Sequence, residues 1–246
     1  MNPPSYNLVL QDRNWVMEKL ANHFHKYIPN SRVSTEADIN SDINFYFNWH
    51  AMRQKTKFDV CWFTHIENRD WWDSIVSACD VAVLHGSKYK DSVPEEKRIT
   101  FYPPPFENFL PQKKTKVLVV GRSYGSNRKN FEAANSIGGL DNIELTFTEG
   151  KLSEQELKEA YLGTDYVLVT SRIEAGPMCV VEALAMNKPV IAPDVGWCWD
   201  YPVIKFSNEE DLNLIFKKLS FPNNAWKIEV ENLIKEINII HDSRHR

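Results

Sequence analysis

The hydrophobic pattern of the chain alternates between two periods. Apolar residues recur every three or four positions in several segments, as at Val16, Leu20, Phe24 and Ile28, which is typical of a helix with one buried face. Short apolar runs typical of buried strands lie at residues 8–10, 43–49, 58–64, 81–84, 116–120, 143–148, 166–170 and 189–193. Strand and helix patterns alternate from 116 to 206, which predicts an α/β fold with parallel sheets covered by helices.

Local signals set the bounds of several helices. Ser153 and Glu156 form a capping-box pattern, and a second such pattern at Ser207 and Glu210 predicts another helix start. Residues 226–240 carry an apolar face that predicts a long C-terminal helix.

Three consecutive prolines divide the chain. Pro103, Pro104 and Pro105 favour an extended, stiff connection. We therefore predict a boundary near residue 108, with one domain over 1–108 and a second over 109–246.

Composition narrows the function classes. The 246 residues provide room for two small domains. The net charge of −4 does not indicate a basic surface for nucleic-acid binding. No apolar run is long enough to span a bilayer and no leader pattern opens the chain, so we expect a cytoplasmic protein. The four cysteines have no metal-ligand spacing, and we expect reduced thiols, no metal and no cofactor.

The segment 166–196 carries the strongest chemical signal. Gly176 and Pro177 open a helix after a buried strand, with Pro177 expected at the first helical position. The next backbone N–H groups, of Met178, Cys179 and Val180, then have no partner within the helix and suit an anion such as phosphate.

Two acids flank this helix start. Glu182 lies one turn further on, on the face of Met178 and Cys179, among apolar neighbours, so a buried carboxylate there needs a hydrogen-bond donor such as a ligand hydroxyl. Glu174, on the turn before the helix, would contact the other end of a polyol phosphate such as a nucleotide sugar. The alternative is that Glu182 pairs with a buried arginine or backbone group and Glu174 is a solvated loop acid.

The run Ser171-Arg-Ile-Glu-Ala-Gly-Pro-Met, ending at Glu182 and followed by Lys188-Pro-Val-Ile-Ala, resembles the Glu, seven residues, Glu motif of retaining glycosyltransferases. That family, the glycosyl transferases group 1 type, has two Rossmann-like domains (the GT-B fold). The resemblance implies that Glu174 contacts the donor sugar and that Glu182 binds the ribose hydroxyls.

A second block is similar to the same family. Gly121 and Arg122 follow a buried strand, and the loop runs to Lys129, with Arg128 as a close rival for the second cation. In the family such an arginine and lysine grip the donor diphosphate, and two cations stabilise a departing diphosphate without a metal. The sequence has no Asp-x-Asp, which argues against the metal-dependent glycosyltransferase fold. Gly150, after the next strand, is expected near the nucleobase.

The first domain departs from the family pattern. It is smaller than usual, and Gln11-Asp12-Arg13-Asn14 stands where the family has a glycine-rich loop. His65 ends a buried strand where family members often carry a histidine near the donor sugar, although a histidine at a strand end is also commonly structural or solvated. The resemblance also implies that the last helix packs back on the first domain.

These observations predict a retaining hexosyl- or pentosyltransferase that moves a sugar from a nucleoside-diphosphate sugar to an acceptor hydroxyl. Arg122, Lys129, Glu174 and His65 are its expected catalytic residues. The family's usual acceptor is a glycan or glycoconjugate, and a modified nucleic-acid base stays open. A sugar-nucleotide epimerase of similar layout and a non-catalytic sugar-nucleotide-binding module are the alternatives.

Overall fold

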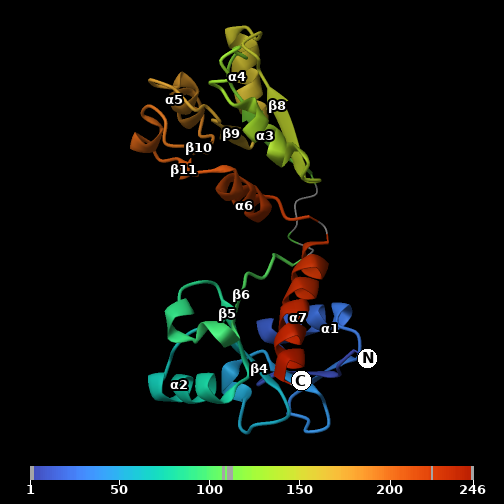
Figure 1. The fold of residues 1–246 in the computed structure, drawn as a ribbon. Coiled ribbons are helices and arrows are strands. Elements are labelled where there is room, and N and C mark those ends of the chain that lie inside the picture. Colours follow the sequence, from blue (N-terminus) through green and yellow to red (C-terminus); the bar gives the residue numbers. More distant parts are fainter. Residues whose placement is uncertain (1–2, 107–108, 110–112, 223, 245–246) are drawn as a thin grey trace. The chain divides into compact units, whose positions relative to one another are not determined.

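The computed structural model describes residues 3–106, 109, 113–222 and 224–244, and it forms two compact units (Figure 1). The first unit combines Met1–Phe106 with Asn224–Arg246, and the second is Glu107–Asn223. Each unit is built on one sheet of parallel strands with helices packed against it. The boundary predicted at residue 108 lies outside the described residues.

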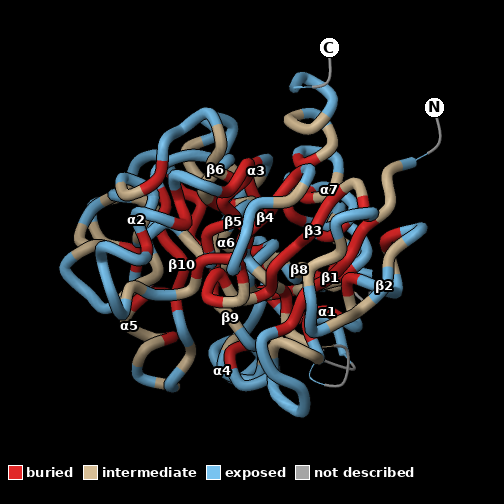
Figure 2. The backbone as a smooth tube through the Cα atoms, turned by 90° about the horizontal axis from the view of Figure 1, so that it is seen from below, coloured by how far each residue is buried: buried red, intermediate tan, exposed pale blue. Residues whose placement is uncertain are grey.

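The first unit contains a six-stranded sheet in the order β2-β1-β3-β4-β5-β6. Its interior strands are buried except for His85 at the end of β5, because both faces of the sheet are covered (Figure 2). The strands are β1 (Tyr6–Val9), β2 (Ser31–Ser34), β3 (Ile43–Tyr46), β4 (Asp59–Phe63), β5 (Val81–His85) and β6 (Arg98–Phe101). The helices are α1 (Val16–Tyr27), α2 (Arg69–Ala78) and α7 (Ala225–Arg244).

The C-terminal helix α7 is part of the first unit and lies beside α1 (Figure 1). Trp226 is 1% exposed, packs into the core that contains Phe24, and donates its indole N–H to the Pro105 carbonyl at 2.9 Å. At the other end of α7, Arg244 forms an ion pair with the buried Asp80. Both ends of the helix are therefore fixed to the unit that contains the start of the chain.

The second unit contains a five-stranded parallel sheet in the order β11-β10-β9-β7-β8. The strands are β7 (Thr115–Val119), β8 (Ile143–Phe147), β9 (Tyr166–Leu168), β10 (Val190–Ala192) and β11 (Ile204–Lys205). The helices are α3 (Phe131–Gly138), α4 (Glu154–Gly163), α5 (Met178–Ala185) and α6 (Glu209–Leu219).

This strand order contains one reversal of direction. From β7 the chain first adds β8 on one side of β7 and then β9 on the other side. In open parallel sheets, ligands bind beyond the carboxyl ends of the strands at such a switch point. The second sheet therefore favours a site where β7 and β9 end.

The predicted α/β class with parallel sheets is confirmed. The capping box at Ser153 and Glu156 is also confirmed, but the start predicted for α6 is wrong. Asn208 caps α6 by accepting from the Asp211 N–H, while the Asp211 carboxylate accepts from the Ser207 N–H at 3.0 Å. The cap residue thus lies one residue later in the chain than predicted, and the carboxylate returns its bond to the residue before the cap.

Replacing Trp226 with alanine should lower the free energy of unfolding of the first unit by about 3–5 kcal/mol, because a fully buried indole is lost. The control is Ile239→Ala on the same helix, where the side chain is 61% exposed and the cost should stay below about 0.5 kcal/mol. Urea unfolding followed by circular dichroism measures both. Equal effects of the two changes would mean that α7 does not pack as described.

Candidate active site

The site is built from the loops that follow β7, β8, β9 and β10, at residues 120–130, 148–152, 169–177 and 193–197, which we call the carboxyl edge of the second sheet. The first two loops are tied together by a side chain. The Gly121 N–H donates to the Thr148 hydroxyl oxygen at 3.0 Å, and this hydroxyl lies 3.3 Å from the Gly121 carbonyl, which accepts from it. Gly121 has a φ of +150°, a conformation that favours glycine.

Lys129 occupies the switch point between β7 and β9. Its side chain passes close to Gly121, where an added Cβ would lie 3.1 Å from the lysine Cε. Its ammonium forms an ion pair with Glu174 at 2.5 Å, and the two side chains are only 15% and 12% exposed. The Ser171 hydroxyl donates to the same Glu174 oxygen, Oε1, at 2.9 Å.

Backbone contacts fix the two loops that carry this pair. The Thr170 hydroxyl donates to the Lys129 carbonyl at 2.6 Å, and the Arg172 N–H donates to the Arg128 carbonyl at 2.8 Å. The Arg128 guanidinium lies over the Tyr124 ring at 4.1 Å, and its Nε is buried without a hydrogen-bond partner among the described residues. Lys129 therefore points into the switch point, while Arg128 packs on its own loop.

The surroundings of Glu174 favour its charged form. Burial alone would raise the pKa of this carboxyl. Hydrogen bonds from Lys129 and Ser171, together with the charges of Lys129 and Arg128, outweigh burial and hold the pKa below its ordinary value. The solvated loop acid considered for this position is wrong, because Glu174 is nearly buried and ion-paired.

Arg122 extends from the end of β7 across the loop after β8. A Cβ at Gly150 would lie 2.0 Å from the Arg122 Cγ, so the arginine side chain fits only over a glycine. A pocket of about 220 Å³ adjoins them and is lined by Val120, Gly121, Arg122, Thr148, Gly150, Leu152 and Leu157. Within the described residues, no hydrogen bond or ion pair is recorded for the exposed guanidinium, which can therefore bind an anion.

The start of α5 differs from the prediction in two respects. Pro177 is the N-cap residue and not the first helical residue, with Met178 as the first. The Val180 N–H donates to the Pro177 carbonyl at 3.0 Å, so only Met178 and Cys179 keep the predicted role of N–H donors. Met178 is 56% exposed, whereas burial raises the pKa of the Cys179 thiol to about 12, which leaves it uncharged.

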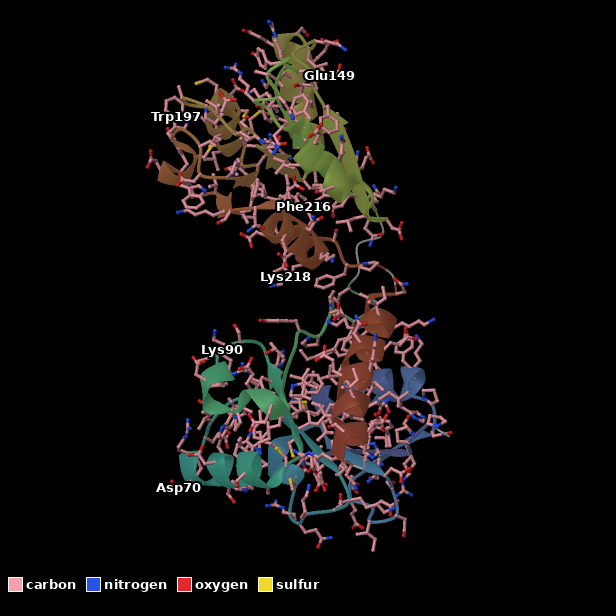
Figure 3. All side chains as sticks on the ribbon, in the orientation of Figure 1. Asp70, Lys90, Glu149, Trp197, Phe216 and Lys218 are labelled. Atoms are coloured by element: carbon pink, nitrogen blue, oxygen red, sulfur yellow. The ribbon has the colours of Figure 1, made fainter. Side chains whose placement is uncertain are left out.

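Trp197, labelled in Figure 3, lies in the loop after β10. Its indole ring packs on Gly176. An added Cβ at Gly176 would lie 2.5 Å from the indole ring, so no side chain fits there. Gly196, with a φ of +53°, brings the loop after β10 close to the backbone of the turn before α5. A Cβ added at Gly196 would lie 2.5 Å from the Ala175 carbonyl oxygen. The indole therefore shapes the turn that leads from Glu174 into α5.

Glu182 is half-buried on α5, as its apolar neighbours predicted. Its partner is neither an arginine nor a backbone group: the Tyr161 hydroxyl of α4 donates to Glu182 Oε2 at 2.7 Å. Tyr161, Ser171, Thr148 and Thr170 are site residues that sequence reasoning did not identify. Only Ser171 carried a local signal, because it lies three residues before Glu174 in the same turn.

His65 lies in the first unit, two residues after the end of β4. Its two ring nitrogens are 2.8 Å from the Thr64 hydroxyl and 2.8 Å from a Glu67 carboxylate oxygen, and its side chain is 51% exposed. A role for His65 beside the donor sugar stays a prediction from the resemblance.

The described part of the chain contains neither a cluster of metal-binding side chains nor a helix that could span a membrane. No group of three or more histidine, cysteine, aspartate or glutamate side chains there is arranged to hold a metal ion. Among the helices that the structure describes, none is both long and apolar enough to cross a membrane.

Comparison with known families gives one match. The family model of the glycosyl transferases group 1 matches residues 106–201. This segment runs from β7 through the loop after β10 and contains every predicted site residue except His65. The match supports glycosyl transfer. A search of curated proteins with the sequence found no match.

Solved structures similar to this chain include a galactosyltransferase and two sugar-phosphate synthases. The apo lipopolysaccharide outer core galactosyltransferase WaaB is 12% identical, covers 98% of this chain and 99% of its own, and has a TM-score of 0.33. The sucrose-phosphate synthase from Thermosynechococcus elongatus is 12% identical, with 93% and 75% covered and a TM-score of 0.34. A UDP-forming trehalose-phosphate synthase from Burkholderia xenovorans is 9% identical, with 84% and 73% covered and a TM-score of 0.35. At these scores the superpositions add nothing to the match over residues 106–201.

The contact between Arg122 and Gly150 predicts an unequal effect of two glycine substitutions. Gly150→Ala should lower the free energy of unfolding by about 1–2 kcal/mol, because the left-handed φ of +68° disfavours alanine and the Arg122 side chain must move. Gly125→Ala, in the loop after β7, meets no atom within 4 Å and should cost less than about 0.5 kcal/mol. Chemical denaturation distinguishes the two; a neutral Gly150→Ala would show that Arg122 does not cross this glycine.

The lowered pKa of Glu174 predicts a pH-dependent stability. A carboxyl whose folded pKa is depressed stabilises the fold above its ordinary value of 4.5 and loses that contribution as the pH falls through the folded pKa. Wild type should therefore exceed Glu174→Gln in urea midpoint at pH 7, and the difference should shrink below pH 4.5. Glu144→Gln, an exposed acid on β8, is the control. A difference that is independent of pH would contradict the ion pair.

Proposed function

We propose that this chain is a glycosyltransferase that moves a sugar from a nucleoside-diphosphate sugar to an acceptor hydroxyl, with retention of configuration and without a metal ion. The observation that carries the proposal is the position of Lys129. Its ammonium lies at the switch point between Gly121 and Glu174, inside the segment that matches the glycosyl transferases group 1.

The first step of the proposed reaction is recognition of the diphosphate. Lys129 and Arg122 come from the same loop, and a diphosphate between them would receive two cationic donors. These cations stabilise the negative charge that develops when the bond between the sugar and the diphosphate breaks. The Met178 and Cys179 N–H groups at the start of α5 supply neutral donors to the same anion.

Diphosphate binding also changes the partner of Lys129. In this structure its ammonium is held by Glu174. A bound diphosphate competes for that ammonium, and Glu174 is then available to accept hydrogen bonds from hydroxyls of the donor sugar. The ion pair thus places both groups before the ligand arrives, which reduces the ordering that binding requires.

The nucleoside occupies the remaining part of the site. Glu182 accepts from the ribose hydroxyls, and the base lies toward Gly150 and the pocket beside Arg122. The acceptor that the family match favours is a glycan or glycoconjugate, with a modified nucleic-acid base as the second class.

Thermal-shift measurements with a panel of nucleotide sugars test the donor class, because a ligand that binds only the native state raises the unfolding temperature. With the donor identified, Arg122→Ala should lower kcat by about 100- to 1,000-fold, as expected when a donor to a developing charge is lost. Glu182→Ala should mainly raise the donor Kd, with a smaller effect on kcat.

The matched control is Lys158→Ala, which removes an exposed cation from α4 of the same unit and should leave both constants unchanged. Two outcomes would contradict the proposal: no nucleotide sugar shifts the unfolding temperature, or Arg122→Ala and Glu182→Ala behave like the control. Conversion of the donor sugar without any acceptor would instead indicate an epimerase.

A further inference from the structure

Tyr161 is a buried polar group that belongs to none of the motifs discussed above. It lies near the end of α4, and its ring is 2% exposed in the core formed with Val167 and Val180. A buried hydroxyl needs a hydrogen-bond partner, and the partner of Tyr161 is Glu182 Oε2, at 2.7 Å. A core residue of one helix therefore holds the carboxylate of the next helix.

The contact leaves most of the carboxylate available. An ionised carboxylate offers about four acceptor positions, and one O–H group occupies only one of them. Within the described residues, the carboxylate of Glu182 has no further hydrogen bond and no ion pair, and the residue is half-buried. Oε1 and part of Oε2 can therefore accept from a ligand.

The Tyr161 hydroxyl is neutral and remains a hydrogen-bond donor to Glu182. Burial, followed by the hydrogen bond to Glu182, raises the pKa of the Tyr161 hydroxyl well above its ordinary value. The neighbouring Cys179 thiol is likewise uncharged. A cationic partner would neutralise the carboxylate, whereas the tyrosine hydroxyl fixes its orientation and leaves its negative charge in place.

We propose that Tyr161 is a positioning residue that holds the Glu182 carboxylate so that it accepts from both hydroxyls of a vicinal diol, and that the site thereby selects ribonucleotides over deoxyribonucleotides. The inference rests on the proposed role of Glu182 as the ribose ligand. A glutamate side chain loses rotamer freedom when it binds a ligand, and a partner that fixes it beforehand reduces this loss.

The test compares Tyr161→Phe with wild type by calorimetric titration of the nucleoside diphosphate found in the donor screen and of its 2′-deoxy form. Removing the hydroxyl retains the buried ring. We expect the variant to bind the ribonucleotide about 3- to 10-fold more weakly, the effect of one lost hydrogen bond, and to bind the deoxynucleotide with little change. The ratio of the two Kd values should therefore fall by the same factor.

Two controls separate positioning from a purely structural role. Tyr166→Phe removes a hydroxyl from the first residue of β9, at the amino end of the strand and away from the carboxyl edge, and should leave the ratio unchanged. In a Glu182→Gln background, Tyr161→Phe should add no further loss of discrimination, because the tyrosine acts through the carboxylate. Both ligands are measured on one preparation, so a partly unfolded fraction lowers the two binding capacities equally and does not change the ratio.

The outcomes distinguish the two proposals. If Glu182→Gln loses the ribose preference and Tyr161→Phe retains it, the positioning role is wrong and the proposed donor site stands. If Glu182→Gln itself retains the preference, or no nucleoside diphosphate binds, the assignment of Glu182 to the ribose is wrong and the role of Tyr161 is refuted with it. Weaker binding of both nucleotides by the same factor would indicate that Tyr161 is only structural.

Discussion

The ion pair between Lys129 and Glu174 is the interaction on which the rest of the site depends. Both side chains are nearly removed from water, and breaking a buried pair by removing one partner leaves an uncompensated charge. The pair also joins the loops after β7 and β9, whose backbones are held by Thr170 and Arg172. A single contact thus fixes a cation and an acid at the point where a parallel sheet binds ligands.

The surrounding glycines make this contact possible. Lys129 reaches Glu174 by passing over Gly121, and Arg122 extends over Gly150. In the next turn, Gly176 accommodates the Trp197 ring. In each case another side chain occupies the space that a Cβ would need, so glycine fits best there. These glycines shape the site without contributing a functional group.

Much of the fold follows from the sequence because the buried parallel strands are mostly apolar, with Asn7, Asn44 and Asp59 as fully buried polar exceptions. The strand β2 was not predicted, since Ser31–Ser34 is a mostly polar edge strand with no buried residue: three residues are half-buried and Arg32 is exposed. The helix α2 was also missed: its adjacent Trp71 and Trp72 obscure the helical period, although only Trp72 is buried.

The site was only partly predictable for a different reason. Motif spacing brings Glu174 and Glu182 to one helix start, because both lie in one short segment. The partner of each acid comes from elsewhere in the chain. Lys129 reaches Glu174 through a loop in which Asn127 and Asn130 adopt left-handed conformations, with φ of 51° and 48°. Tyr161 reaches Glu182 from another helix, and no local pattern encodes either contact.

The different partners give the two acids different behaviour on ligand binding. Glu174 is paired with a cation, so any anion that recruits Lys129 must first compete with this carboxylate, and the competition costs binding free energy. Glu182 is paired with a neutral hydroxyl and has acceptor positions left over, so it can receive a ligand without releasing Tyr161. The two carboxylates therefore differ in what they can accept: Glu182 keeps acceptor positions beside Tyr161, whereas the acceptor positions of Glu174 are held by Lys129 and Ser171 until another anion takes the ammonium.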